Sequence, residues 1–230
     1  DLAKKLDAEI INADSIQVYK DFDIGSAKPK SLGDIPHHLF SELSPEEEFN
    51  AGIFCRKAKV LISEIIERGK LPLICGGTGL YIQALLNDTL EIEFSNDDEN
   101  KENIYRALVV ALLPERELLY ERINKRVLEM CEEGLVDEVK SLLEKYDKNS
   151  KSFASIGYKE TISFLENEIE FEQMQEQIQQ HTRNLAKRQM TWWRNQPGKM
   201  GWVDVEGELD QVIESFLEKK GRLASEDIYY

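Results

Sequence analysis

Short apolar runs alternate with helical periodicity along the first half of the chain. The runs at residues 8–12 and 71–75 are typical of buried strands. Between them, Pro45 and Glu46 are expected to open a long helix. Its apolar residues recur at helical spacing over Asn50–Arg68, and Gly69 predicts its end. Another helix is expected over Tyr81–Leu86. This strand–helix–strand–helix order predicts an α/β fold with a parallel sheet and right-handed crossovers.

Helical patterns dominate the second half. Apolar runs at residues 107–113 and 202–205 predict two further strands, and helices are expected over residues 115–131, 134–146, 172–194 and 209–219. The stretch 95–102 is acidic and nearly free of apolar side chains, which is typical of a solvated linker. We therefore expect residues 1–94 and 103–230 to form a single α/β core with C-terminal helices, joined at residues 95–102.

A glycine-rich turn, Gly76–Gly79, follows the strand predicted at residues 71–75. Its three glycines let the backbone turn sharply and approach a ligand or another strand. A strand–turn–helix arrangement places Thr78 at the carboxyl edge of a parallel sheet, where α/β proteins bind ligands. A tight turn without chemistry explains this segment equally well when it is taken alone.

Asp14 and Ser15 follow the first predicted strand, so the same sheet edge is expected to carry them. A helix cap or an Asx turn is the favoured interpretation of both residues from position alone. The alternative is that Asp14 presents its carboxylate to an active-site crevice.

The composition is that of a globular protein: the chain has 230 residues, of which 41% are hydrophobic. No apolar run is long enough to cross a bilayer. The three cysteines are odd in number and widely spaced, which favours reduced thiols over a disulfide framework or a zinc cluster. We expect a cytoplasmic protein without a metal site built from its own side chains.

The net charge of −15 disfavours general attraction to nucleic acids. Charges are screened beyond about 8 Å at physiological salt, so a local basic surface is still compatible with it. The segment from His181 to Lys199 contains no acidic residue, and Arg183, Lys187 and Arg194 fall on one narrow stripe of its helix. This basic stripe favours binding of a nucleic-acid backbone. We expect Trp192 and Trp193, on the same helix, to be buried in the core.

Two other pairs are candidates for chemistry. Arg122 and Arg126 lie four residues apart and hence on one helix face, where they either are solvated or bind an anion. His37 and His38 are a weak metal pair, since neighbours in an extended segment point to opposite faces. We expect one of these histidines to be buried and hydrogen-bonded and the other to be exposed.

Several segments occur together in an order that is diagnostic in combination: residues 13–19 (ADSIQVY), 24–29 (IGSAKP), 35–39 (IPHHL), 76–81 (GGTGLY), 116–123 (RELLYERI), 156–160 (IGYKE) and 182–192 (TRNLAKRQMTW). Through these segments, which are spread along most of the chain, the sequence closely resembles the tRNA dimethylallyltransferases. Those enzymes transfer a dimethylallyl group from its diphosphate to N6 of the adenosine next to the anticodon, position 37. The resemblance implies a P-loop NTPase-like parallel sheet flanked by helices.

The resemblance also implies residue roles. Asp14 is the general base for the adenine amino group, and Arg126, with Arg122, holds the diphosphate leaving group, which Mg²⁺ bridges. The residues implied to contact the extruded adenosine and its neighbours are Ser15, Ile16, Gln17 and Thr78. Those implied to hold the backbone of the anticodon stem-loop are Gly157, Tyr158, Lys159, Arg183, Lys187 and Arg188. We expect Asp14 and Thr78 to converge on one rim that Arg126 closes, in a monomer without membrane contact.

The sequence departs from the family in two places. The family opens with a phosphate loop of the G-x-x-x-x-G-K-[ST] type, which is not found here, and residues 95–102 stand where the family has a helical insertion. If the molecule lacks both parts, we expect no transferase activity. The alternatives are an adenylate isopentenyltransferase, a P-loop small-molecule kinase and a non-catalytic RNA-binding protein.

Overall fold

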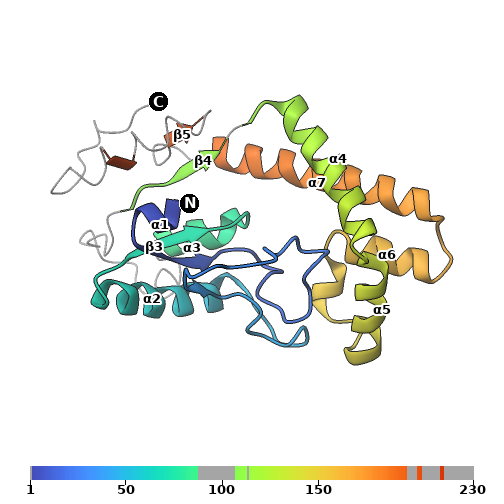
Figure 1. Cartoon of the computed structure of the whole chain (residues 1–230), viewed down its shortest axis with the longest axis horizontal. Coiled ribbons are helices and arrows are strands. Elements are labelled where there is room, and N and C mark those ends of the chain that lie inside the picture. Colours follow the sequence, from blue (N-terminus) through green and yellow to red (C-terminus); the bar gives the residue numbers. More distant parts are fainter. Residues whose placement is uncertain (1, 88–106, 113, 196–200, 204–212, 215–230) are drawn as a thin grey trace, which may run out of the picture.

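The computed structural model describes residues 2–87, 107–112, 114–195, 201–203 and 213–214 (Figure 1). It has the predicted α/β class. A three-stranded parallel sheet has the order β2 (His37–His38), β1 (Ala8–Asn12), β3 (Leu71–Cys75). The helices of this half are α1 (Leu2–Lys5), α2 (Ala51–Glu67) and α3 (Gly79–Asn87).

The register between β1 and β3 determines which residues meet at the carboxyl edge. Ala8 pairs with Leu71, and the pairing runs without a break to Asn12 and Cys75. The amide of Ala13 then donates to the Cys75 carbonyl over 2.8 Å, which extends the ladder by one bond. Both strands therefore end at the same level. The residues of β3 are half-buried, apart from exposed Cys75, rather than fully buried as its apolar run predicted, since the strand lies at one edge of the described three-stranded sheet.

Helix α2 forms where its periodicity predicted. The Asn50 side chain caps it by accepting from the Ile53 amide over 3.0 Å, and Gly69, at φ +74°, ends the segment that follows. Its buried side chains recur at helical spacing and cover the sheet: Phe54, Cys55, Ala58, Ile62 and Ile65. The ring of Phe54 stacks on that of Tyr81 of α3, with centroids 5.0 Å apart.

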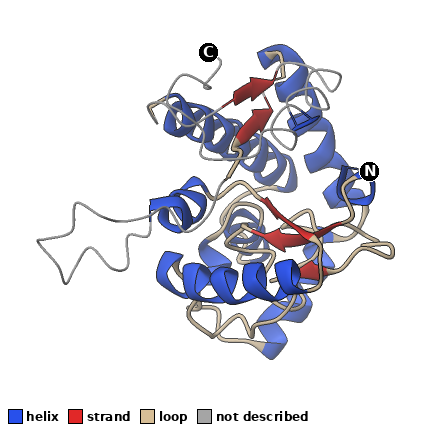
Figure 2. Cartoon of the chain, turned by 90° about the vertical axis from the view of Figure 1, so that its left-hand side faces the viewer, coloured by secondary structure: helices blue, strands red, loops and turns tan. Residues whose placement is uncertain are grey.

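The second half is mainly helical, with a two-stranded parallel sheet formed by β4 (Val110–Leu112) and β5 (Gly201–Val203). Its helices are α4 (Arg116–Glu132), α5 (Leu135–Lys145), the 3-10 helix η1 (Lys151–Ala154), α6 (Tyr158–Leu165) and α7 (Phe171–Arg194). Figure 2 shows β4 and β5 apart from the main sheet. The helix expected at residues 209–219 lies outside the described residues, except for helical Ile213 and Glu214.

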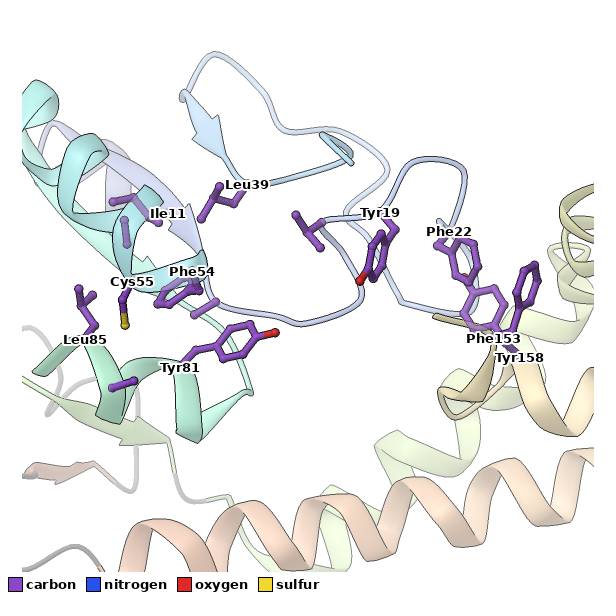
Figure 3. Packing of buried hydrophobic residues seen from close by; sticks show 14 of the residues in the cluster. Ile11, Tyr19, Phe22, Leu39, Phe54, Cys55, Tyr81, Leu85, Phe153 and Tyr158 are labelled. Carbon is purple, nitrogen blue, oxygen red and sulfur yellow. The ribbon is translucent and has the colours of Figure 1, made fainter. Parts of the chain in front are cut away.

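Helix α7 spans both halves of the molecule, since it packs on α4 and α6 and also on α3 (Figure 1). A second contact between the two halves is formed by aromatic side chains. Phe22, in the loop after β1, packs against Phe153 and Tyr158 with ring centroids 5.2 and 4.5 Å apart (Figure 3). All three side chains are buried. The segments that follow β1 are thus held by the helical half.

Among the described helices, none has the length and apolar character that a bilayer crossing requires. The three cysteines are free, with Cys55 buried, Cys75 exposed and Cys131 between the two.

Candidate active site

The carboxyl edge of β1 and β3 brings Ser15 and Thr78 together. The Ser15 amide donates to the Thr78 hydroxyl over 3.2 Å, and the Thr78 amide donates to the Ala13 carbonyl over 3.2 Å. Gly76 permits this approach, since a Cβ at that position would lie 2.4 Å from the Ala13 carbonyl carbon. We call residues 13–17 and 76–79 the rim.

Asp14 is held by one of its two carboxylate oxygens. Its Oδ1 accepts from the amides of Ile16 and Gln17 over 2.8 and 3.2 Å, so the capping interpretation describes its local geometry. Among the described residues, none donates to Oδ2. The half-buried carboxylate is therefore fixed in orientation while one oxygen stays available to a ligand.

Tyr81 is a titratable group close to Asp14. Burial, with the negative charges of Tyr19 and Asp14 nearby, raises the pKa of Tyr81 to about 12. Its hydroxyl donates to the Phe49 carbonyl over 3.4 Å. Tyr81 is thus neutral at physiological pH.

Gln17 braces the loop formed by residues 24–29. Its side-chain nitrogen donates to the carbonyls of Ser26 and Ala27 over 3.0 and 3.4 Å. The Lys28 side chain is nearly buried and bonds to Asp23 and Ser41, both over 2.8 Å, as well as to the Tyr19 carbonyl. The loop is therefore a structural support for the rim, through hydrogen bonds that link it to residues 17 and 19.

Glu138 of α5 supports the same loop from the other side. Its carboxylate accepts from the amides of Asp23, Ile24 and Gly25 over 3.2, 2.7 and 3.1 Å, and from the Tyr158 hydroxyl over 2.8 Å. Sequence reasoning missed this residue. The available signal was an acidic side chain on the same helix face as Leu135, Val139 and Leu142, which are core residues.

Gly157, Tyr158 and Lys159 lie at the start of α6, but the structure separates their surroundings. Tyr158 has no exposed surface, and Gly157 is buried at φ +94° against the Gly25 carbonyl. The Gly157 amide donates to Glu160 over 2.7 Å. A buried side chain is not available to RNA, so Tyr158 has a packing role here. Lys159 is exposed and is the member of the trio that we retain for RNA.

Arg122 and Arg126 are both exposed on α4. Within the described residues, neither guanidinium has an acidic partner. Both are therefore free to bind an anion from outside the protein. No described contact joins Arg126 to Asp14 or Thr78. Its closing of the rim and its binding of the diphosphate remain predictions.

The basic stripe of α7 is partly engaged with the protein itself. Arg183 donates to the side chains of Asn124 and Gln180 over 2.5 and 2.8 Å, and it is half-buried. Lys187 and Arg188 are exposed, and their side chains bond to no described residue. These two residues are the more accessible for an RNA backbone.

The expected burial of the tryptophans is wrong for this part of α7. Trp193 is only half-buried, and Trp192 is 36% exposed. The ring of Trp192 packs over the backbone of Gly79, where a Cβ would lie 2.5 Å from the ring. This ring covers a turn at the surface and does not enter the core.

The adjacent histidines are both half-buried and both hydrogen-bonded, so the expected division into a buried and an exposed residue is wrong. His37 Nδ1 lies 2.6 Å from the Ile35 carbonyl, and His38 Nε2 lies 2.8 Å from buried Glu9. Glu9 also forms a two-point ion pair with Arg68, over 3.0 and 2.6 Å. The two histidines are therefore structural, because each ring bonds to a residue on or beside the strands of the main sheet.

No group of three metal-ligating side chains occurs among the described residues. Mg²⁺ is commonly bound through one or two carboxylates together with substrate phosphates, and does not need an all-protein cage. An ion that arrives bound to a diphosphate substrate would therefore need no such group in the protein.

Comparison with known proteins adds independent information. The family model described as IPP transferase matches residues 17–107 and 91–196. The tRNA dimethylallyltransferase of Macrococcus caseolyticus is 36% identical over 95% of this chain and 88% of its own length. That of Bacillus subtilis is 33% identical over 92% and 87%.

Solved structures agree with these sequence matches. The tRNA isopentenylpyrophosphate transferase of Bacillus halodurans superposes with a TM-score of 0.83 at 32% identity, covering 94% of this chain and 90% of that one. A eukaryotic dimethylallyltransferase acting on tRNA gives a TM-score of 0.75 at 26% identity, over 88% and 69%. With its family match, its relatives and its fold in agreement, this chain belongs to the IPP transferase family.

Proposed function

We propose that this protein transfers a dimethylallyl group from dimethylallyl diphosphate to N6 of the adenosine at position 37 of tRNA. Family membership supports the reaction class. The observation that carries the assignment to a site is the rim, where Asp14 is anchored through Oδ1 with Oδ2 unbonded to any described residue, beside the Ser15–Thr78 contact.

In the proposed reaction, the adenine N6 forms a bond to the allylic carbon as the bond from that carbon to the diphosphate oxygen breaks. The amine is a weak nucleophile because its lone pair is delocalised into the ring. Asp14 Oδ2 accepts the N6 proton as the new bond forms, and the diphosphate leaves with the electron pair. Two backbone donors hold Oδ1, so the carboxylate needs no reorientation during this step.

Arg126, with Arg122, is proposed to bind the leaving diphosphate, because the fork of a guanidinium matches phosphate oxygens in two places. Mg²⁺ bound to the diphosphate would neutralise part of its charge. The exposure of both arginines, without an acidic partner among the described residues, supports this role.

The adenosine has to leave its stack before N6 can reach the rim. Ser15, Ile16, Gln17 and Thr78 are proposed to contact it there. Lys159, Lys187, Arg188 and Arg183 are proposed to bind the phosphates of the anticodon stem-loop. We propose that the protein acts as a monomer in the cytoplasm.

The test compares Asp14→Asn with wild-type full-length protein, because asparagine keeps an oxygen that can cap the turn but cannot act as a base. Prenylation of an anticodon stem-loop is followed by mass spectrometry. We expect Asp14→Asn to lower kcat by about 10²-fold or more, with RNA affinity little changed. Turnover at the wild-type rate would remove Asp14 as the base.

The same assay tests the other activities. AMP replaces the stem-loop in one arm, and ATP replaces the allylic diphosphate in another. Preferential prenylation of AMP would indicate an adenylate isopentenyltransferase, and phosphoryl transfer from ATP would indicate a kinase.

A further inference from the structure

Helix α7 contacts the glycine turn on both sides of Thr78. The Gln189 side-chain nitrogen donates to the Gly77 carbonyl over 2.9 Å. One turn further along the helix, the Trp192 ring lies against Gly79. Gln189 joins segments 112 residues apart, so the turn is held by the second half of the chain as well as by β1.

The two glycines make this contact close. A Cβ at Gly77 would lie 2.4 Å from Gln189 Nε2, and a Cβ at Gly79 would lie 2.5 Å from Trp192. Contacts that short essentially never occur for a real Cβ. Gly79 therefore needs glycine as long as the Trp192 ring stays in place, whereas a Cβ at Gly77 would displace the end of the Gln189 side chain. Helix packing therefore explains the absence of a side chain at Gly79, and the hydrogen bond of Gln189 depends on the absence of one at Gly77.

We infer that Gln189 is a positioning residue. By holding the Gly77 carbonyl it fixes the position of Thr78, and Thr78 in turn fixes the backbone of Ala13 and Ser15 on either side of Asp14. The inference rests on the proposed function, whose site it deepens. Thr78 lies between the two clamped glycines, and it bonds to both Ala13 and Ser15. A shift of the turn would move the hydroxyl that holds Ser15 and hence the residue next to the base.

We call the contacts of Gln189 with Gly77 and of Trp192 with Gly79 the clamp. The geometry of α7 places Gln189 away from the basic stripe. At about 100° per residue, Arg183, Lys187 and Arg194 lie roughly 120° to 160° around the helix from Gln189. RNA bound along the stripe would therefore leave the clamp intact. One helix can bind the substrate on one face and support the catalytic turn with another.

The test uses Gln189→Met in the full-length protein, because methionine keeps the length of the side chain and removes the donor. Gln177→Met is the matched control, since Gln177 is exposed on the same helix and its side chain has no described hydrogen bond. Three experiments are made on each variant: prenylation kinetics, which give kcat and KM; RNA binding, which gives the affinity; and hydrogen–deuterium exchange of the rim.

We expect Gln189→Met to lower kcat by about 10-fold to 100-fold, because a misplacement of about 1 Å near the chemistry has an effect of that order. Amide exchange should quicken at residues 13–17 and 76–81 and stay unchanged in α2. RNA affinity should stay within about threefold of wild type, since the interaction that is removed does not touch RNA. Gln177→Met should resemble wild type throughout.

Wild-type kcat together with wild-type exchange at the rim would overturn the inference. A loss of RNA affinity without faster exchange would also overturn it, since Gln189 would then be an RNA contact. If wild-type protein transfers no prenyl group, the proposed function fails. Faster exchange of the rim in Gln189→Met would still establish the positioning contact. Gln189→Glu, which keeps the shape but cannot donate while ionised, gives the same readout if the methionine variant folds poorly.

Discussion

The amide of Ser15 donates to the hydroxyl of Thr78 across 3.2 Å, although 63 positions separate the two residues. This bond joins the ends of β1 and β3 at the edge where the proposed chemistry takes place. It forms only because Gly76 lets the turn approach Ala13. The rim therefore depends on a glycine that itself carries no chemistry.

Gly76→Ala should disrupt this edge. The added Cβ would lie within 2.4 to 2.8 Å of three backbone atoms of Ala13, which have no rotamer with which to move aside. We expect a loss of about 3 kcal/mol in the free energy of unfolding, measured by urea denaturation, together with a large loss of turnover.

Gly33→Ala is the control for that variant. A Cβ at Gly33 meets no atom within 4 Å, and the only cost is its φ of +61°. We expect a loss of about 1 kcal/mol with normal turnover. Equal effects of the two substitutions would show that close approach at Gly76 is unimportant.

Glu138→Ala should destabilise the junction between the halves more than Tyr158→Phe does. Removal of the carboxylate leaves three backbone amides and a phenol without their acceptor, whereas removal of the phenol leaves the other three bonds in place. We expect about 3 kcal/mol for Glu138→Ala and about 1 kcal/mol for Tyr158→Phe. Burial and the neighbouring Glu138 raise the pKa of Tyr158, so its hydroxyl stays protonated as the donor.

Chemical denaturation at neutral pH measures both variants. An effect of Glu138→Ala no larger than that of Tyr158→Phe would mean that water replaces the carboxylate at the loop, and that the loop needs no anchor from α5.

The ion pair of Glu9 with Arg68 should make stability depend on acid pH. The Arg68 guanidinium lowers the pKa of Glu9 from about 4.5 to about 2, with help from His38 and against burial, which raises it. A carboxyl group whose pKa is lowered by folding stabilises the protein fully above its unfolded pKa. This contribution is therefore present above about pH 4.5 and is lost as the pH falls toward 2.

Arg68→Ala tests this contribution. We expect a loss of stability at pH 7 that shrinks as the pH falls from about 4.5 toward 2, because the unfolded chain takes up the Glu9 proton first and folded wild type does so only near pH 2. Arg56→Ala, an exposed arginine on the same helix, is the control and should have little effect at any pH. A difference between Arg68→Ala and wild type that is independent of pH would assign the arginine to packing alone.

Lys187→Ala should weaken RNA binding and reduce its dependence on salt. Removal of one cation that neutralises a phosphate is expected to lower the slope of log K against log salt concentration by about 0.9. Arg183→Ala should lower the slope in the same way and also destabilise the protein, since it ties α7 to Asn124. The double variant should combine both effects.

Binding of a labelled stem-loop across a salt series measures the slope. Lys140→Ala is the control, since Lys140 is an exposed lysine on α5, 3.8 Å from Asp137 and outside the stripe. An unchanged slope in Lys187→Ala would exclude this lysine as a phosphate ligand.

The local pattern of the chain was sufficient for the long helices and for the edge at which the site lies. The apolar periodicity over Asn50–Arg68 matches α2 at Ala51–Glu67, but the expected start at Pro45 and Glu46 was wrong, because these residues form a turn and Asn50 caps the helix. Helix α7 was expected at residues 172–194 and is found at Phe171–Arg194. Apolar periodicity and glycine positions report on local backbone preference, which these elements obey. The order of strands and helices likewise placed Asp14 and Thr78 at one edge, because parallel strands end together.

Only the tertiary structure determines which side chains are buried and which residues they contact. The family resemblance implied an RNA contact for Tyr158, and sequence reasoning placed Trp192 in the core. The folded chain instead buries Tyr158 and leaves Trp192 partly exposed over Gly79. It gave no role to Glu138 or Gln189. Periodicity identifies the apolar face of a helix but not the segment that meets it. Such partners come from sheet register and helix packing, which bring together residues more than a hundred positions apart.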